Sequence, residues 1–165
     1  SGGSIVSIRC TKTYPNAGRY YLFNFPLWGV YINPDTILKP GIMPGECWAF
    51  EGSEGYVVIK LAARIIVKSF TMEHVPKELS LYGHIKSAPN DFSVWGLEDE
   101  NDQNPVLLGN FRFLDNGESL QQFKAKKGGG GFDMIELKIE SNHGNLDYTC
   151  LYRFRVHGIP VYGLT

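Results

Sequence analysis

The sequence predicts an all-β fold, a single antiparallel β-sandwich. Short runs of alternating apolar and polar residues recur along the chain, and 19 glycines and 9 prolines are spread between them. Alternation with a period of two is typical of half-buried strands, and glycine and proline favour the turns between strands. No segment of the sequence carries a long apolar stripe at helical spacing. The length of 165 residues suits one domain.

The strands are predicted from these runs in chain order. They cover residues 4–10, 56–60, 64–68, 70–74, 92–97, 106–113, 134–140 and 151–157. The run at 134–140 alternates most clearly, because Ile135, Leu137 and Ile139 fall on one face and charged residues on the other. Many short strands separated by turn residues favour a sandwich of two packed sheets.

The last predicted strand, residues 151–157, alternates in the same way. Phe154 and Val156 fall on one face. Arg153 and Arg155 fall on the opposite face, which we expect to point outward. A strand of this kind has one face in the core and one face toward solvent.

The nearly equal numbers of basic and acidic residues argue against one class of partner, the nucleic acids. The chain has 16 Lys and Arg against 17 Asp and Glu, for a net charge of −1. A protein that binds a phosphate backbone carries an excess of basic residues, so we expect no nucleic-acid partner at this domain. No apolar run approaches the roughly 20 residues that span a bilayer. The chain begins Ser-Gly-Gly without Met, as an excised fragment does, so we expect any membrane attachment to come from upstream segments.

Three cysteines leave two interpretations open. One is a disulfide with one leftover thiol, which is then free or paired with another chain. The other is three reduced, buried thiols in a cytosolic protein, and the spacing alone favours it. There is no C-x-x-C motif, so a structural zinc site has little support.

Residues 14–34 do not fit a compact sandwich, because neither a strand nor a helix period holds across them. The segment carries an unusual number of aromatic residues, namely Tyr14, Tyr20, Tyr21, Phe23, Phe25, Trp28 and Tyr31. The commoner interpretation of such a segment is a loop packed back on its own domain. The functional interpretation is a lid or arm that closes over a partner.

Enzymatic signatures are essentially missing from the sequence. Four histidines, at positions 74, 84, 143 and 157, could act as bases, but there is no Gly-x-Ser-x-Gly motif and no recognised cysteine signature. A thiol enzyme that pairs Cys10 or Cys150 with a histidine stays as a rival, and it would need a cysteine of low pKa. We therefore expect a binding module and no enzyme.

Three longer motifs carry a resemblance to a known family. Residues 44–50, Pro-Gly-Glu-Cys-Trp-Ala-Phe, resemble the Pro-Gly-Asn-Cys-Trp-Ala-Phe signature of SUN domains. Residues 87–92, Ser-Ala-Pro-Asn-Asp-Phe, resemble the family's Ser-Ala-Pro-Lys-Asp-Phe. Residues 148–158 match the family's C-terminal run almost letter for letter. By this resemblance, residues 1–165 are identified as one SUN domain.

The resemblance implies a role at the nuclear envelope. SUN proteins are inner nuclear membrane proteins whose C-terminal domain lies in the perinuclear space. They form homotrimers and bind the C-terminal luminal peptides of KASH proteins, which makes the LINC complex between nucleus and cytoskeleton. We therefore expect a non-enzymatic tether with a KASH peptide as its partner. The rival binding class is a lectin-like carbohydrate-binding module of galactose-binding or discoidin type, which is built on the same sandwich plan.

The resemblance also implies a peptide site. The family sandwich carries a projecting β-hairpin, the KASH lid, which corresponds to residues 14–34. Residues 22–28, Leu-Phe-Asn-Phe-Pro-Leu-Trp, resemble the family's Leu-Phe-Gly-Ile-Pro-Leu-Trp. We expect the lid to contact the peptide through Leu22, Phe23 and Trp28. We expect four residues to hold the terminal carboxylate: His74, Ser87, Tyr148 and Tyr152. For both tyrosines, the alternative is core packing with a satisfied hydroxyl.

The cysteines and one loop also take roles from the resemblance. Cys47 and Cys150 correspond to the family's intramolecular disulfide, and Cys10 to the cysteine that bonds certain KASH tails. Residues 36–47 correspond to a cation loop that binds potassium or sodium through backbone carbonyls, and no other cofactor is required. The expected ligands are Thr36, Lys39, Gly41, Glu46 and Tyr152. Three of these positions depart from the family, which has Gln in place of Lys39, Asp in place of Gly41 and Asn in place of Glu46.

Overall fold

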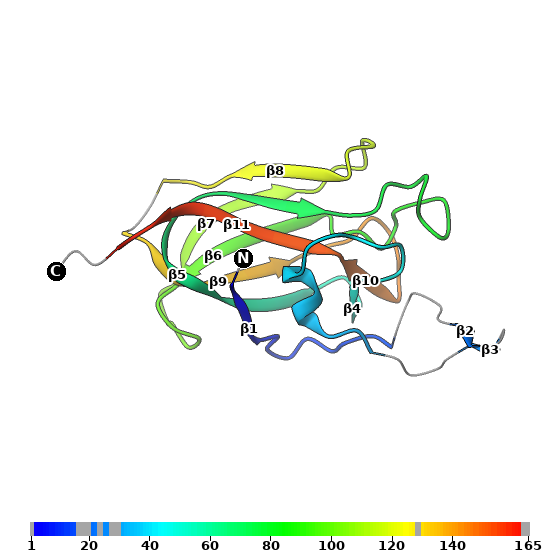
Figure 1. Ribbon diagram of the computed structural model, residues 1–165, viewed down its shortest axis with the longest axis horizontal. Coiled ribbons are helices and arrows are strands. Elements are labelled where there is room, and N and C mark those ends of the chain that lie inside the picture. Colours follow the sequence, from blue (N-terminus) through cyan, green and yellow to red (C-terminus); the bar gives the residue numbers. More distant parts are fainter. Residues whose placement is uncertain (1, 16–20, 23–24, 27–30, 128–129, 163–165) are drawn as a thin grey trace.

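The computed structural model describes residues 2–15, 21–22, 25–26, 31–127 and 130–162. Its elements are β1 (Ser4–Ser7), β2 (Tyr21–Leu22), β3 (Phe25–Pro26), the 3-10 helix η1 (Pro34–Leu38), β4 (Trp48–Glu51), β5 (Gly55–Glu73), β6 (Asp91–Leu97), β7 (Val106–Arg112), β8 (Leu120–Lys124), β9 (Phe132–Ile139), β10 (Tyr148–Leu151) and β11 (Arg153–Pro160). Every strand pair is antiparallel, which confirms the predicted fold class (Figure 1). None of the helices in the described part of the chain is long and apolar enough to cross a membrane.

The long strand β5 joins the two layers of the sandwich. Its first half pairs with β1 on one edge and β9 on the other, and β9 continues through β6 to β7. Its second half pairs with β11 and β8. The pairing with β9 is irregular between Lys60 and Ile65, where the strand turns from one layer into the other. The sequence predicted three strands here, but the chain stays extended through the corner and forms one strand of 19 residues.

The core lies between these two layers. Phe92 of β6 packs edge-on against Phe123 of β8, with ring centroids 5.0 Å apart. Phe70 of β5 packs in the same manner against Phe111 of β7 at 5.7 Å. The alternating face predicted for β9 is confirmed, since Ile135, Leu137 and Ile139 are fully buried. Burial of each such side chain contributes about 1.5–3 kcal/mol.

The sequence did not predict two strands, β4 and β8, and two predicted strands have other bounds in the structure. β4 is buried on both faces, so it shows no alternation. β8 alternates between exposed and half-buried residues, but polar residues fall on both of its faces. The predicted strand at 4–10 ends at Ser7, because Arg9 adopts a left-handed conformation with φ of 52°. The predicted strand at 151–157 is divided at Tyr152 between β10 and β11.

A small second sheet, β4 with β10, covers one end of the sandwich. One face of β4, with Trp48 and Phe50, belongs to the main core. The opposite face, with Ala49 beside Cys150 of β10, belongs to a separate buried cluster. The start of the aromatic segment lies along the free edge of β4, where the Tyr14 N–H donates to the Ala49 carbonyl at 2.8 Å.

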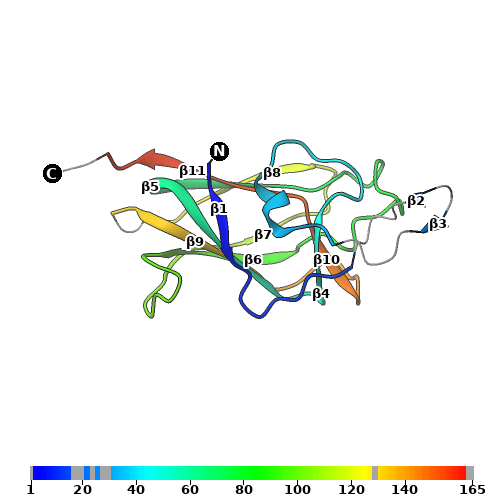
Figure 2. The same ribbon diagram turned by 60° about the horizontal axis from the view of Figure 1, so that its bottom comes forward.

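The strands β2 and β3 pair with each other, Tyr21 opposite Pro26 and Leu22 opposite Phe25. In both views they lie outside the body of the sandwich, beyond the end that carries β4 and β10 (Figures 1 and 2). Phe23 and Trp28 lie outside the described residues, and only the backbone of Leu22 is described.

Candidate functional site

A small pocket opens beside β10, between the end of β5 and the loops that follow it. Its volume is about 30 Å³. All four residues predicted to hold a carboxylate, His74, Ser87, Tyr148 and Tyr152, line it. The other lining residues are Gly45, Val75, Ser80, Leu81, Tyr82, His84 and Cys150. We call this the tyrosine–histidine pocket.

The alternation of β10 places its side chains on two different faces. Thr149 and Leu151 point into the interior and are fully buried. Tyr148 and Cys150 point to the opposite face, toward the pocket, and Tyr152 follows where β10 gives way to β11. The Cys150 N–H donates to the Ser87 carbonyl at 2.8 Å, so the loop that carries Ser87 is fixed directly against the strand.

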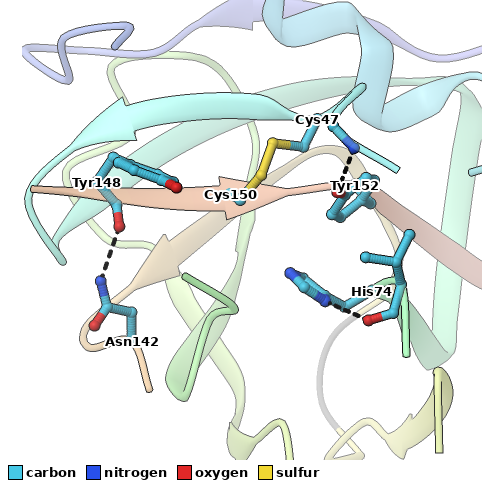
Figure 3. The surroundings of a disulfide bond; sticks show 8 residues. Cys47, His74, Asn142, Tyr148, Cys150 and Tyr152 are labelled. Atoms are coloured by element: carbon cyan, nitrogen blue, oxygen red, sulfur yellow. Dashed lines mark hydrogen bonds between the residues drawn. A yellow bond between two sulfur atoms is a disulfide. The ribbon is translucent and has the colours of Figure 1, made fainter. Parts of the chain in front are cut away.

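His74 lies at the base of the pocket and is 3% exposed. Its Nδ1 lies 2.8 Å from the Val75 carbonyl, as Figure 3 shows. Its Nε2 is buried and has no hydrogen-bond partner among the described residues. Burial lowers the pKa of His74 to about 4, opposed by the Val75 carbonyl and Asp115 and assisted by His143. The ring is therefore neutral at physiological pH.

Tyr152 closes one wall of the pocket. Its ring meets the His74 ring edge-on, with centroids 4.8 Å apart. Its hydroxyl oxygen accepts a hydrogen bond from the Gly45 N–H at 2.9 Å. Burial raises its pKa, which the Gly45 hydrogen bond partly offsets and the Glu46 carboxylate reinforces. The phenol therefore stays neutral, and its hydroxyl hydrogen is free to be donated.

Tyr148 forms the other wall and is half-buried. Its ring stacks on Tyr14 with centroids 5.0 Å apart. The Asn142 side chain donates to the Tyr148 carbonyl at 3.2 Å (Figure 3). The Tyr148 N–H donates to Asn145 Oδ1 at 3.1 Å. Burial raises its pKa, and nearby Tyr82 adds to the effect. Sequence reasoning missed Asn142 and Asn145, since amides in a polar turn carry no distinguishing pattern.

The rim of the pocket also includes residues that sequence reasoning missed. Ser80, Leu81, Tyr82 and His84 belong to the loop after β5 and line the pocket opposite β10. The only signal that could have indicated them is the adjacent apolar pair Leu81–Tyr82 in a loop that has no strand or helix period. The lining contains no carboxylate and no Lys or Arg among the described residues, so its polar groups are hydroxyls, imidazoles and backbone.

A disulfide joins Cys47 to Cys150 beneath the pocket, with Cα atoms 5.6 Å apart (Figure 3). It ties the loop before β4 to β10 across 103 residues of sequence. The alternative of three reduced thiols is therefore wrong, and Cys150 cannot serve as an enzymatic nucleophile. Cys10 is a free, exposed thiol. It lies in the turn after β1, where the Thr11 N–H donates to the Ile8 carbonyl.

The residues expected to bind a cation gather around a different hollow, of about 410 Å³. Four of the five line it, namely Thr36, Lys39, Gly41 and Glu46. Tyr152 does not, because its hydroxyl bonds Gly45 and its ring lines the tyrosine–histidine pocket. Within the described ranges there is no cluster of three His, Cys, Asp or Glu side chains suited to a metal. Any cation held here would depend on backbone carbonyls, as the resemblance implies.

Comparison with known proteins identifies the family of this chain. The family model described as Sad1/UNC-like C-terminal matches residues 27–160. The chain belongs to the SUN domain family. Klaroid protein of Drosophila melanogaster is 49% identical over 163 residues, and SUN domain-containing protein 1 of Homo sapiens is 50% identical over 163 residues. Both alignments cover 97% of the chain, but only 17% and 21% of the relatives, so the SUN domain spans about a fifth of their length.

Solved structures outside the family share the architecture of this SUN domain. A family 32 carbohydrate-binding module from Streptococcus pneumoniae EndoD superimposes with a TM-score of 0.66 at 14% identity, covering 95% of this chain and 96% of that one. An F5/8 type C domain from Bacteroides fragilis gives 0.58 at 10% identity, covering 97% and 99%. At these identities the likeness concerns the fold alone. It shows a discoidin-like sandwich and does not argue for carbohydrate binding.

Proposed function

We propose that this SUN domain is a non-enzymatic tether that captures the C-terminal luminal peptide of a KASH protein in the perinuclear space. The parent protein would then be an inner nuclear membrane protein of the LINC complex. It would work as a homotrimer and connect the nucleus to the cytoskeleton. Membership of the SUN family supports this role, as does the identity of about half with SUN domain-containing protein 1.

The observation that carries the proposal is the convergence of four residues in one pocket. His74, Ser87, Tyr148 and Tyr152 come from three separate stretches of chain and meet in a space of about 30 Å³. A terminal carboxylate needs several donors when it leaves water. The two tyrosines stay protonated and can donate, as can the serine hydroxyl. The small volume suits a chain end better than a mid-chain segment.

The rest of the peptide would bind as an added strand. An extended peptide can pair with an exposed hairpin edge and satisfy its main-chain groups, while pockets receive its alternate side chains. The β2–β3 pair lies outside the sandwich and offers such an edge. Leu22, Phe23 and Trp28 would cover the apolar side chains of the peptide. The exposed Cys10 would bond a cysteine of the tail, since the perinuclear space is continuous with the oxidising ER lumen.

A bound potassium or sodium ion would complete the loop at 36–47. Thr36, Lys39, Gly41 and Glu46 surround one hollow, and the Gly45 hydrogen bond to Tyr152 connects this loop to the tyrosine–histidine pocket. An ion would neutralise carbonyl dipoles and stiffen that connection. The expected result is a higher melting temperature in potassium or sodium chloride than in choline chloride at equal ionic strength. Identical melting temperatures in all three salts would contradict the binding of potassium or sodium by this loop.

The test of the tether uses a synthetic peptide with the luminal C-terminal sequence of a KASH protein. It is prepared as the free acid, as the C-terminal amide and with one added glycine. Calorimetry on the SUN domain is expected to show binding of the free acid and a large loss for the other two. Equal affinity for the acid and the amide would overturn capture of the carboxylate.

A further inference from the structure

A hollow of about 300 Å³ lies along the second edge of β11. Among the described strands β11 pairs with β5 alone, and all of its residues 153–157 line the hollow. In both views the start of β1 lies beside β11 (Figures 1 and 2), and Gly2 and Gly3 line the hollow from that side. We call this the edge hollow. It shares no lining residue with the tyrosine–histidine pocket, so it takes no part in the proposed capture of a peptide end.

Two arginines that line the edge hollow share one carboxylate. Glu73 Oε1 accepts from Arg155 Nη2 at 3.1 Å and from Arg153 Nη1 at 3.5 Å. Within the described residues, Glu73 is the only acidic partner of either arginine. The three side chains are between 13% and 36% exposed. One positive charge is therefore left without a partner in a partly buried place, where an unpaired charge is costly.

Hydrogen-bond donors are left over at the same place. The Nε atoms of Arg153 and Arg155 are buried and have no partner among the described residues. Burial and the neighbouring Arg155 lower the pKa of His157, so this ring is neutral at physiological pH and adds no charge. No Asp or Glu is among the described residues that line the edge hollow. The surplus of charge and of donors therefore fits a bound anion.

The remaining wall of the edge hollow is apolar. Because β11 alternates, Arg153 and Arg155 fall on one face of the strand, and Phe154 and Val156 on the other. A hollow along the edge of the strand meets both faces. Further apolar lining comes from η1 and from β5, namely Leu38, Ile59, Leu61, Ala62 and Ile65. A cationic side and an apolar side in one hollow fit an anion that carries a hydrocarbon chain.

We propose that the edge hollow binds an aliphatic carboxylate, the anion of a fatty acid. The carboxylate would accept from the terminal N–H groups of Arg155, the more exposed of the two arginines, and the chain would lie along the apolar wall. One surplus positive charge matches one carboxylate, whereas a phosphate monoester carries close to two negative charges. The volume falls at the lower end of the range of about 300–1,000 Å³ that is typical of ligand pockets.

The experiment titrates the SUN domain with hexanoate, octanoate and decanoate below their micelle concentrations. Decyltrimethylammonium has the same chain as decanoate and the opposite charge, so it tests the role of the head group. Calorimetry measures each affinity, and thermal melting checks that the variants fold. The chain-length and charge comparisons use the parent domain alone, so they test the proposal even where a variant unfolds.

Two variants with matched controls locate the site. Arg155→Gln removes the charge, and its control is Arg112→Gln, since Arg112 pairs with Asp91 and is not in the lining. Ala62→Phe places a ring in the edge hollow, and its control is Ala63→Phe. Both alanines are exposed, but only Ala62 lines the hollow.

The affinity of the parent domain should rise by about two- to fourfold for each methylene added from hexanoate to decanoate, and decyltrimethylammonium should not bind. Arg155→Gln should weaken decanoate binding by about tenfold. Ala62→Phe should abolish it, and both controls should bind as the parent does. All four variants should keep the preference of the domain for the free-acid KASH peptide.

An affinity that does not change with chain length would overturn the proposal, as would equal decanoate binding by Arg155→Gln and the parent. If decanoate does not bind and Ala62→Phe alters the sedimentation of the domain, the edge hollow is a contact between copies of the chain instead. Each of these results leaves the tether intact, because the tether is tested by the comparison of acid and amide peptides.

Discussion

His74 donates a hydrogen bond to the carbonyl of Val75, with Nδ1 and the oxygen 2.8 Å apart. A carbonyl can only accept, so Nδ1 carries the hydrogen of the neutral ring and Nε2 presents a lone pair. This Nε2 is buried and has no partner within the described residues. A carboxylate also offers only lone pairs. His74 can therefore contact a bound carboxylate through Nε2 only after the ring takes up a second proton.

Peptide binding is therefore expected to be coupled to protonation of His74. In the free pocket burial holds the pKa of His74 at about 4, and a carboxylate would raise it in the complex. Between these two pKa values binding takes up a proton, so affinity should rise as the pH falls, by up to about tenfold per pH unit. Calorimetry in buffers of different ionisation enthalpy measures the proton uptake directly.

Two variants isolate the group responsible for this pH dependence. His74→Gln should bind weakly and without pH dependence. His84→Gln should keep the dependence, because His84 lies at the exposed part of the same pocket. An affinity for the free acid that stays constant from neutral to mildly acidic pH would contradict direct contact with His74.

The free domain should lose stability in acid for the same reason. The pKa of His74 is lowered from 6.5 to about 4 in the folded state, so the unfolded chain binds more protons between these values. The stabilisation is complete above pH 6.5 and is lost as the pH falls through 4, and it amounts to about 3 kcal/mol at most. The difference in melting temperature between parent and His74→Gln should shrink as the pH falls from 7 to 4. A difference in melting temperature that stays constant from pH 7 to pH 4 would contradict the loss of stability expected from protonation of His74.

The sequence predicted the framework well where burial alternates and poorly where it does not. The alternation of Ile135, Leu137 and Ile139 with more exposed residues predicts β9, because one face of the strand is buried and the other is turned toward solvent. β4 carries no such signal, since both of its faces are packed. The joining of three predicted strands into β5 depends on partners far along the chain, which a local pattern cannot report.

The same contrast holds at the site. His74, Ser87, Tyr148 and Tyr152 were predicted from motif resemblance, and the structure brings them to one pocket. Spacing alone would not have joined them, because they meet only through the register of β10 and the loops after β5. The Ser80–His84 side of the pocket was missed, since loop residues follow no period. Its position comes from local hydrogen bonds of Ser80.

Removing the disulfide is expected to destabilise the domain strongly. Cys47 and Cys150 close a loop of 103 residues, and a bond across such a loop contributes about 4–5 kcal/mol on the chain-entropy model. The double variant Cys47→Ser/Cys150→Ser should therefore unfold at a lower denaturant concentration than the parent. The matched control is Cys10→Ser, which should leave the midpoint unchanged because Cys10 is exposed and free. Equal denaturation midpoints for the parent, the double variant and Cys10→Ser would contradict a stabilising role of the disulfide.

Gly96 permits a close approach between β6 and a buried ring. A Cβ built on it would lie 2.6 Å from ring atoms of Phe132, which is 4% exposed. Gly96→Ala should force this ring to move and destabilise the fold by about 1–3 kcal/mol, measured by chemical denaturation. Gly130→Ala is the control, since a Cβ there would meet nothing within 4 Å. Equal stability of the two variants would show that the ring relocates freely.

Cys10 is expected to strengthen the tether without contributing to recognition of the peptide end. It lies in the exposed turn after β1 and is not among the described residues that line the tyrosine–histidine pocket. With oxidised glutathione as the oxidant, which leaves as two reduced glutathiones, a KASH peptide that contains a cysteine should form a disulfide-linked adduct with the parent domain, visible on a non-reducing gel. Cys10→Ser should abolish the adduct and leave the affinity measured under reducing conditions unchanged. An adduct that persists in Cys10→Ser would mean that the Cys47–Cys150 pair exchanges with the peptide instead.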